Sequence, residues 1–188
     1  RVRVGVSLLV NQPQPQASVF SFEYNNVHHP DADDTALALI GLRLAEPRKK
    51  EEFDALFQRA LGGQLSFQCK DGGWAAFDKD VTQHWLEDMP FADHNAILDP
   101  TCSDLTARTL ELFGYLGEEG KPVWVRRAVQ YLIDTQDDDG SWYGRWGGNY
   151  IYGTWQVLRG LRDIKADMTT DWISRGRGCP ESSQHEDC

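Results

Sequence analysis

A repeated turn motif is the feature that most constrains how this chain folds. The pattern Gln-x-x-x-Gly-x-Trp occurs twice, as Gln68-Cys-Lys-Asp-Gly72-Gly-Trp74 and as Gln136-Asp-Asp-Asp-Gly140-Ser-Trp142, and the two copies start 68 positions apart. Glycine permits a sharp turn, glutamine can hydrogen-bond the backbone of that turn, and tryptophan can cover a helix end with apolar surface. Tandem helix–turn units of this kind stack into solenoids or α/α-barrels.

An amphipathic helix is expected in front of each copy. Apolar residues recur at helical spacing over 51–61 and again over 125–133. Further helices are expected over 34–45, from a cap at Ser103, and over 153–164, and no convincing pair of β-strands is found. Two chance turns would explain the motif alone, but the matched helices favour a repeat. The sequence therefore predicts an all-α fold, with 184–188 as an incomplete third copy.

Charge and composition exclude some classes of function. The chain has 188 residues and a net charge of −10, which argues against nucleic-acid binding because that needs clustered Lys and Arg. The four cysteines form no CxxC pair and have no metal-like spacing to histidine, so a reducing compartment is expected. No apolar run approaches the roughly 20 residues that span a bilayer, so a transmembrane protein is not expected, whereas attachment to a membrane surface stays open.

Three carboxylates stand at the start of an apolar helix, in Asp31-Ala-Asp33-Asp34-Thr35. One Asp would suffice to cap the helix N-terminus. Three close carboxyl groups cannot all ionise, so the cluster should retain a proton near neutral pH. Such an acid can protonate a weak base. Two alternatives stay open on spacing alone: simple N-capping, and a Mg²⁺ site built from clustered Asp oxygens.

Aromatic residues gather in a second cluster, where Trp142, Tyr143, Trp146, Tyr150 and Tyr152 fall within eleven residues and are separated by glycines. The π-faces of such rings attract cations, and do so more strongly where water is excluded. Packing in the core or in turns is the alternative, and it suffices for most of these rings.

These segments together resemble the squalene–hopene cyclases. Asp31-Ala-Asp33-Asp34-Thr35-Ala36 resembles the DxDDTA acid motif of class II terpene cyclases, and the two Gln/Trp motifs resemble the QW repeats of the triterpene cyclase branch. The run from Gly140 to Thr154 and the segment from Phe22 to Pro30 are similar to squalene–hopene cyclases in particular. The acid motif alone is moderately specific, whereas all these motifs in this order are highly specific.

The resemblance implies roles for individual residues. Asp33 would donate the proton to the terminal alkene of squalene, with Asp31 and Asp34 in support. Tyr152 matches a tyrosine that helps hold a water near the acid. Asp104 and Arg108 match a polar pair that orients and tunes the acid, and some members have His where this chain has Arg108. The aromatic residues that would line the cavity and stabilise cations are Phe22, Trp146 and, more weakly, Phe77, where some members have Tyr.

The resemblance also implies the setting of these residues. Family members are two-domain α-barrel proteins that bind one membrane leaflet, are commonly dimeric, and need no metal or organic cofactor. The segment 20–175 is then expected to be part of the α/α-barrel catalytic domain. We expect 1–19 to be a divergent or linker segment and 176–188 a truncated or divergent repeat end. A peripheral location on the cytoplasmic side of the membrane is expected, and the isolated chain is expected to be inactive.

Two other functions compete with this interpretation. The first is another class II cyclase, acting on oxidosqualene or on a diterpene diphosphate. Oxidosqualene cyclases usually carry Cys after the acid, so Asp34 favours squalene. The second is a non-catalytic α/α-solenoid module in which the Asp cluster only caps a helix.

Overall fold

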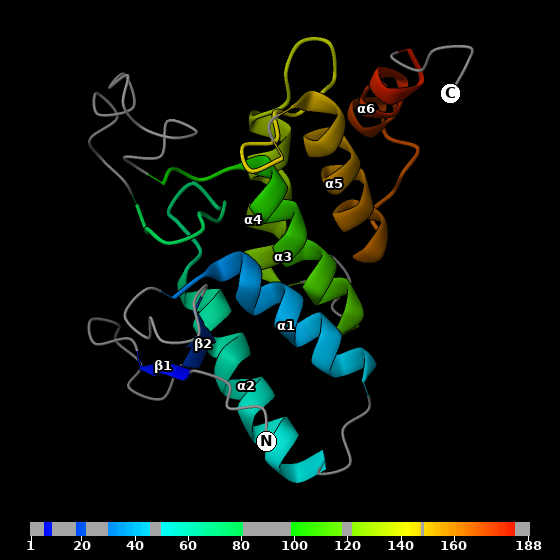
Figure 1. Ribbon diagram of the computed structural model, residues 1–188. Coiled ribbons are helices and arrows are strands. Elements are labelled where there is room, and N and C mark those ends of the chain that lie inside the picture. Colours follow the sequence, from blue (N-terminus) through cyan, green and yellow to red (C-terminus); the bar gives the residue numbers. More distant parts are fainter. Residues whose placement is uncertain are drawn as a thin grey trace.

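The computed structural model of the protein describes residues 6–8, 18–21, 30–45, 50–80, 99–117, 122–147 and 149–182 (Figure 1). The fold of this part is helical, as the sequence predicts. Its helices are α1 (Ala32–Leu44), α2 (Lys50–Ser66), α3 (Ser103–Tyr115), α4 (Val123–Asp134), α5 (Tyr150–Asp163) and α6 (Asp171–Ser182). The all-α class is confirmed, and closure of these helices into a barrel stays a prediction.

A short pair of antiparallel strands was not expected from the sequence. Strand β1 (Val6–Leu8) pairs with β2 (Ser18–Phe20), so that Val6 lies opposite Phe20. The backbone N–H of Phe20 donates to the Thr35 hydroxyl at 2.9 Å, and the backbone N–H of Asp31 donates to the Phe20 carbonyl at 2.9 Å. Strand β2 therefore fastens the beginning of α1, where the acidic cluster lies.

Helix α3 occupies the middle of the bundle, with α1 and α2 on one side and α5 on the other (Figure 1). It packs most extensively against α5 and next against α1. Side chains on all sides of α3 are therefore buried, including Leu105, Leu110, Leu112 and Phe113. Because α3 has little solvent-facing surface, any charged group on it must find its partners inside the protein.

The two Gln/Trp motifs form equivalent turns. In the first, the Gln68 side-chain amide donates to the carbonyls of Gly72 and Trp124, at 2.9 Å each. The fully buried Trp74 indole donates to the Gln64 carbonyl at 2.8 Å. Gly72 has a φ of 100°, a conformation that favours glycine. The turn thus ties the end of α2 to the beginning of α4.

The second motif repeats each of these contacts. The Gln136 side-chain amide donates to the carbonyls of Gly140 and Trp172, at 2.8 Å each. The buried Trp142 indole donates to the Leu132 carbonyl at 2.7 Å, and Gly140 has a φ of 90°. The turn ties the end of α4 to the beginning of α6. Matching contacts at both sites confirm that the motif is a structural repeat and not a chance similarity, whereas the proposed third copy at 184–188 lies outside the described residues.

Ser103 is not the cap of α3, contrary to the prediction. Cys102 occupies the N-cap position and makes no side-chain capping hydrogen bond. Ser103 is the first helical residue, and its hydroxyl lies 3.2 Å from the Thr135 hydroxyl at the end of α4. Its polar group therefore joins two helix ends instead of capping one.

Candidate active site

Asp31 is the residue that caps α1. Its backbone is extended, with φ −121° and ψ 123°, and its Oδ1 accepts hydrogen bonds from the backbone N–H groups of Asp33 at 2.7 Å and Asp34 at 3.0 Å. One carboxylate therefore satisfies the helix N-terminus, as capping chemistry requires. The other two carboxyl groups of the cluster are free of that task.

Asp33 lies against α3. Its Oδ1 is 3.3 Å from Nε of Arg108, in an ion pair that is not aligned as a hydrogen bond. The Asp33 side chain is 29% exposed and that of Arg108 is 13% exposed, so the pair is largely shielded from solvent. Burial raises the pKa of Asp33, and the Arg108 charge opposes this rise. The neighbouring charges of Asp34 and Asp104 raise it further.

The other two carboxyl groups of the cluster also hold their protons more tightly than usual. Burial raises the pKa of Asp31 to about 6, although the backbone hydrogen bonds from Asp34 and Asp33 oppose it. Burial likewise raises the pKa of Asp34. The raised pKa values agree with the expectation that this cluster retains protons, and desolvation is the larger cause, ahead of mutual repulsion.

Asp104 links the beginning of α3 to the aromatic segment. It is 1% exposed, and its Oδ2 accepts a hydrogen bond from the backbone N–H of Trp146 at 2.9 Å. The Trp146 ring meets the Phe77 ring edge to face, with centroids 6.1 Å apart and an angle of 82° between the planes. Trp146 is 38% exposed and Phe77 is partly buried. The structure thus joins three of the predicted site residues, from segments far apart in the sequence.

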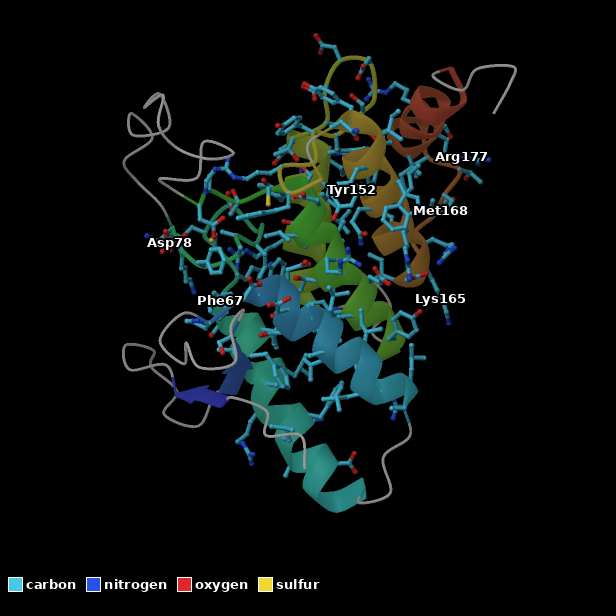
Figure 2. All side chains as sticks on the ribbon, in the orientation of Figure 1. Phe67, Asp78, Tyr152, Lys165, Met168 and Arg177 are labelled. Atoms are coloured by element: carbon cyan, nitrogen blue, oxygen red, sulfur yellow. The ribbon has the colours of Figure 1, made fainter. Side chains whose placement is uncertain are left out.

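Tyr152 lies in the first turn of α5, beside α3 (Figure 2). Burial raises the pKa of its hydroxyl, and the Arg108 guanidinium opposes this rise through its charge and through a hydrogen bond. The charges of Asp104 and Asp33 also act on this hydroxyl. Tyr152 therefore belongs to the same polar group as the acid. Phe22, predicted to line the cavity, lies outside the described residues.

Residues of α3 and α5 that were not predicted extend this polar group. Glu111 lies one turn after Arg108. Its carboxylate forms an ion pair with Arg159 of α5, in which Oε1 and Nη2 are 2.7 Å apart. Its other oxygen accepts a hydrogen bond from the Gln156 amide at 3.1 Å. Glu111 is 1% exposed and Gln156 is fully buried. The sequence signal that could have revealed Glu111 is its position as a charged residue between Leu110 and Leu112.

Comparison with known protein families decides the relationship of this chain. The sequence model of the squalene-hopene cyclase C-terminal domain matches residues 2–188. The chain belongs to the squalene-hopene cyclase family. This confirms the resemblance drawn from the acid motif and the Gln/Trp repeats, and it places the chain in a family of cyclase enzymes.

Relatives within the family carry different enzyme names. A squalene-hopene cyclase of Schizosaccharomyces japonicus is 45% identical over 79% of this chain, and a squalene–hopene cyclase of Bradyrhizobium diazoefficiens is 42% identical over 88%. A dammaradiene synthase of Dryopteris crassirhizoma is 38% identical over 82%. The matched portions make up 22%, 26% and 24% of these relatives, so the chain spans about a quarter of their length.

Two kinds of feature are absent from the residues that the structure describes. No group of three or more His, Cys, Asp or Glu side chains in these ranges is placed so that it could hold a metal ion. Among the helices of the described ranges, none has both the length and the hydropathy that a membrane crossing needs.

Proposed function

We propose that this chain carries the catalytic acid of a cyclase that converts squalene into hopene or hopanol. The observation that carries the proposal is the half-buried ion pair of Asp33 with Arg108, at 3.3 Å, beside the carboxyl groups of Asp31 and Asp34. Burial raises the pKa of Asp33. A carboxyl group whose pKa is raised by burial, with a fixed cation beside it, is suited to general acid catalysis on a very weak base.

The first step is protonation of the terminal alkene. The O–H bond of Asp33 breaks, the alkene π electrons form the new C–H bond, and a tertiary carbocation is left on the substrate. The Asp33 carboxylate formed in this step gains the full attraction of Arg108, which the neutral acid lacks. The cation beside the acid therefore stabilises the product side of proton transfer more than the reactant side, which lowers the barrier.

Ring closure then proceeds through successive carbocations. Each alkene in turn attacks the cation, so that a C–C bond forms and the positive charge moves along the folded substrate. Trp146 and Phe77 present aromatic surface close to the segment held by Asp104, and Phe22 is carried forward by resemblance alone. Aromatic faces can stabilise such cations without reacting with them. Loss of a proton from the final cation gives hopene, and capture of water followed by loss of a proton gives hopanol.

The substrate and product are the finer part of the proposal. Asp34 follows the acid, which favours squalene over its epoxide on family resemblance, and two of the relatives described above are named as squalene–hopene cyclases. The relative named dammaradiene synthase is the reason to test the product spectrum directly. Because squalene is a hydrocarbon that water excludes, we also propose that the cyclase takes it from a membrane surface as a peripheral protein. A dimeric state is carried forward from the family resemblance alone.

The test is the substitution Asp33→Asn in the complete cyclase that contains this chain. Asparagine has nearly the same shape but cannot supply the proton, so we expect loss of hopene and hopanol with an unchanged circular dichroism spectrum and thermal midpoint. Asp54→Asn, an exposed carboxylate on α2, is the matched control and should retain activity. Unchanged product yield in Asp33→Asn would rule out the mechanism.

Two further measurements separate the alternatives. Preferential turnover of oxidosqualene over squalene, with products identified by mass spectrometry, would contradict the substrate assignment. Activity that is lost in EDTA and restored by Mg²⁺ would favour the metal-site interpretation of the Asp cluster. We expect full activity in EDTA.

A further inference from the structure

Glu111 is a buried carboxylate in the middle of the bundle. It is 1% exposed, and Leu110, Leu112 and Phe113 beside it on α3 are fully buried. Removing a charge from water is costly unless the protein supplies partners for it. Glu111 therefore requires compensation from neighbouring residues.

That compensation comes from two arginines, together with the Gln156 amide, which donates to Oε2 at 3.1 Å. Nη2 of Arg159 lies 2.7 Å from one carboxylate oxygen of Glu111, and Nη1 of Arg108 lies 3.5 Å from the other. Arg159 is itself held in place by the Trp155 ring, whose centroid is 5.6 Å from the guanidinium carbon. Arg159 lies closer to Glu111 than Arg108 does, and Arg108 also forms an ion pair with Asp33.

Arg108 lies between two carboxyl groups. Its Nε faces Asp33 at 3.3 Å, while its Nη1 faces Glu111 at 3.5 Å. The guanidinium is planar and rigid, so a contact at one edge fixes the direction of the other edge. Glu111 is therefore one constraint, beside the hydrogen bond with Tyr152, on where the positive charge next to Asp33 is placed.

We propose that Glu111 is a positioning residue for the acid, which holds the Arg108 guanidinium in place and takes up part of its charge so that Asp33 keeps its proton until the alkene arrives. The inference rests on the proposed role of Asp33 as proton donor. It assigns Glu111 no contact with the substrate.

The summed charge of Asp33, Arg108, Glu111 and Arg159 accounts for this role. With Asp33 neutral, these four residues together carry one net positive charge. After proton transfer from Asp33, their summed charge is zero. Without Glu111, the neutral acid would face two uncompensated arginines and would lose its proton at a lower pH. The other ionisable groups that act on Asp33 or Glu111 are Asp31 and Asp34 from α1, Asp104 from α3, and Tyr152 and Arg162 from α5.

Two substitutions should move the pH dependence in opposite directions. Cyclisation requires protonated Asp33, so kcat falls as the pH rises through the pKa of this group. Glu111→Gln removes the negative charge that compensates Arg108, so the guanidinium favours the Asp33 anion more strongly. The midpoint of the fall in kcat should therefore move to lower pH by about half to one unit. Arg159→Gln removes a positive charge, so Glu111 compensates the charge of Arg108 more fully. The midpoint of the fall in kcat should then move to higher pH by a similar amount.

The measurement is kcat for squalene as a function of pH in the complete cyclase, with the thermal midpoint recorded beside it. Arg159→Lys keeps the charge and should restore the midpoint toward the unsubstituted value. Asp134→Asn, an exposed carboxylate on α4, is the control and should leave the profile unchanged. If Glu111→Gln does not fold, the Arg159 variants still test the inference, because Arg159 is one-third exposed, at 33%.

The outcomes separate this inference from the proposed function. Opposite shifts of the two midpoints support the positioning role. Equal midpoints in all variants, with only lower thermal stability, would overturn it and would leave Glu111 a purely structural residue. Activity that survives Asp33→Asn would instead overturn the proposed function itself.

Discussion

Arg108 and Asp33 meet across the contact between α3 and α1, with Nε and Oδ1 3.3 Å apart. The pair combines two opposed effects on one carboxyl group. Burial favours the neutral acid, whereas the adjacent guanidinium favours the anion. Since burial is the larger effect, the pKa of Asp33 is raised, and the cation remains in place to stabilise the carboxylate after the proton has left.

The substitution Arg108→Gln tests this balance. Glutamine removes the charge that lowers the pKa of Asp33, so the alkaline fall of kcat should move to higher pH by about one unit. The maximal kcat should nevertheless drop about tenfold or more, because the carboxylate formed by proton transfer loses its partner. The measurement is the pH profile of squalene cyclisation in the complete cyclase.

Arg43→Gln is the matched control for this prediction. Arg43 is exposed in the last turn of α1, at the opposite end of the helix that carries the acid. It should leave both the midpoint and the maximal rate unchanged. A midpoint that moves to lower pH in Arg108→Gln would contradict the assigned effect of the guanidinium.

Asp31 offers a prediction on stability. Its pKa is about 6 in the folded protein against 3.8 for an ordinary Asp, so the folded state binds the proton more tightly than the unfolded state. Stability from this group is therefore present at low pH and is lost as the pH rises from about 4 to about 6. Above pH 6 the buried carboxylate costs up to about 3 kcal/mol.

The substitution Asp31→Asn should remove this cost. Asparagine is also a favourable N-cap, so the hydrogen bonds to the beginning of α1 can be kept. We expect a higher thermal midpoint than that of the unsubstituted protein at pH 8, and no such gain near pH 4. Asp138→Asn, in an exposed turn, should show no such difference. An Asp31→Asn variant that is less stable at pH 8 would show that the carboxylate makes contacts that asparagine cannot replace.

Much of the helical fold could be predicted from the sequence because it is encoded locally. The apolar spacing within 51–61 and 125–133 lies inside α2 and α4, and the expected 153–164 corresponds to α5. Helix α6 was not predicted, because Asp171–Ser182 contains two glycines and a proline and lacks a regular apolar stripe. The three-residue strands β1 and β2 were missed because they are too short to show alternation.

The site was predictable only where a motif marked it. Three acids in four residues drew attention to Asp33, yet the division of roles depended on geometry, since the sequence could not show that Asp31 would be the cap. Glu111 was missed because an Arg and a Glu three positions apart on a helix usually form an exposed pair. Burial of this pair arises from the packing of α3 against α5, a tertiary contact that helical spacing does not reveal.

The Gln/Trp turns lead to a last prediction, on Gly72. Its φ of 100° is unfavourable for any residue with a Cβ, and a Cβ there would lie 2.5 Å from the backbone carbonyl oxygen of Arg127 on α4. Gly72→Ala should therefore cost both backbone strain and a displacement of α4, about 3 kcal/mol or more in the free energy of unfolding. Gly117→Ala separates the two effects, because Gly117 has a φ of 79° but no atom of the described residues within 4 Å of its Cβ position, so it should cost only about 1 kcal/mol. Chemical denaturation of both variants measures the difference, and equal losses would show that the close approach of this turn to Arg127 on α4 does not depend on glycine.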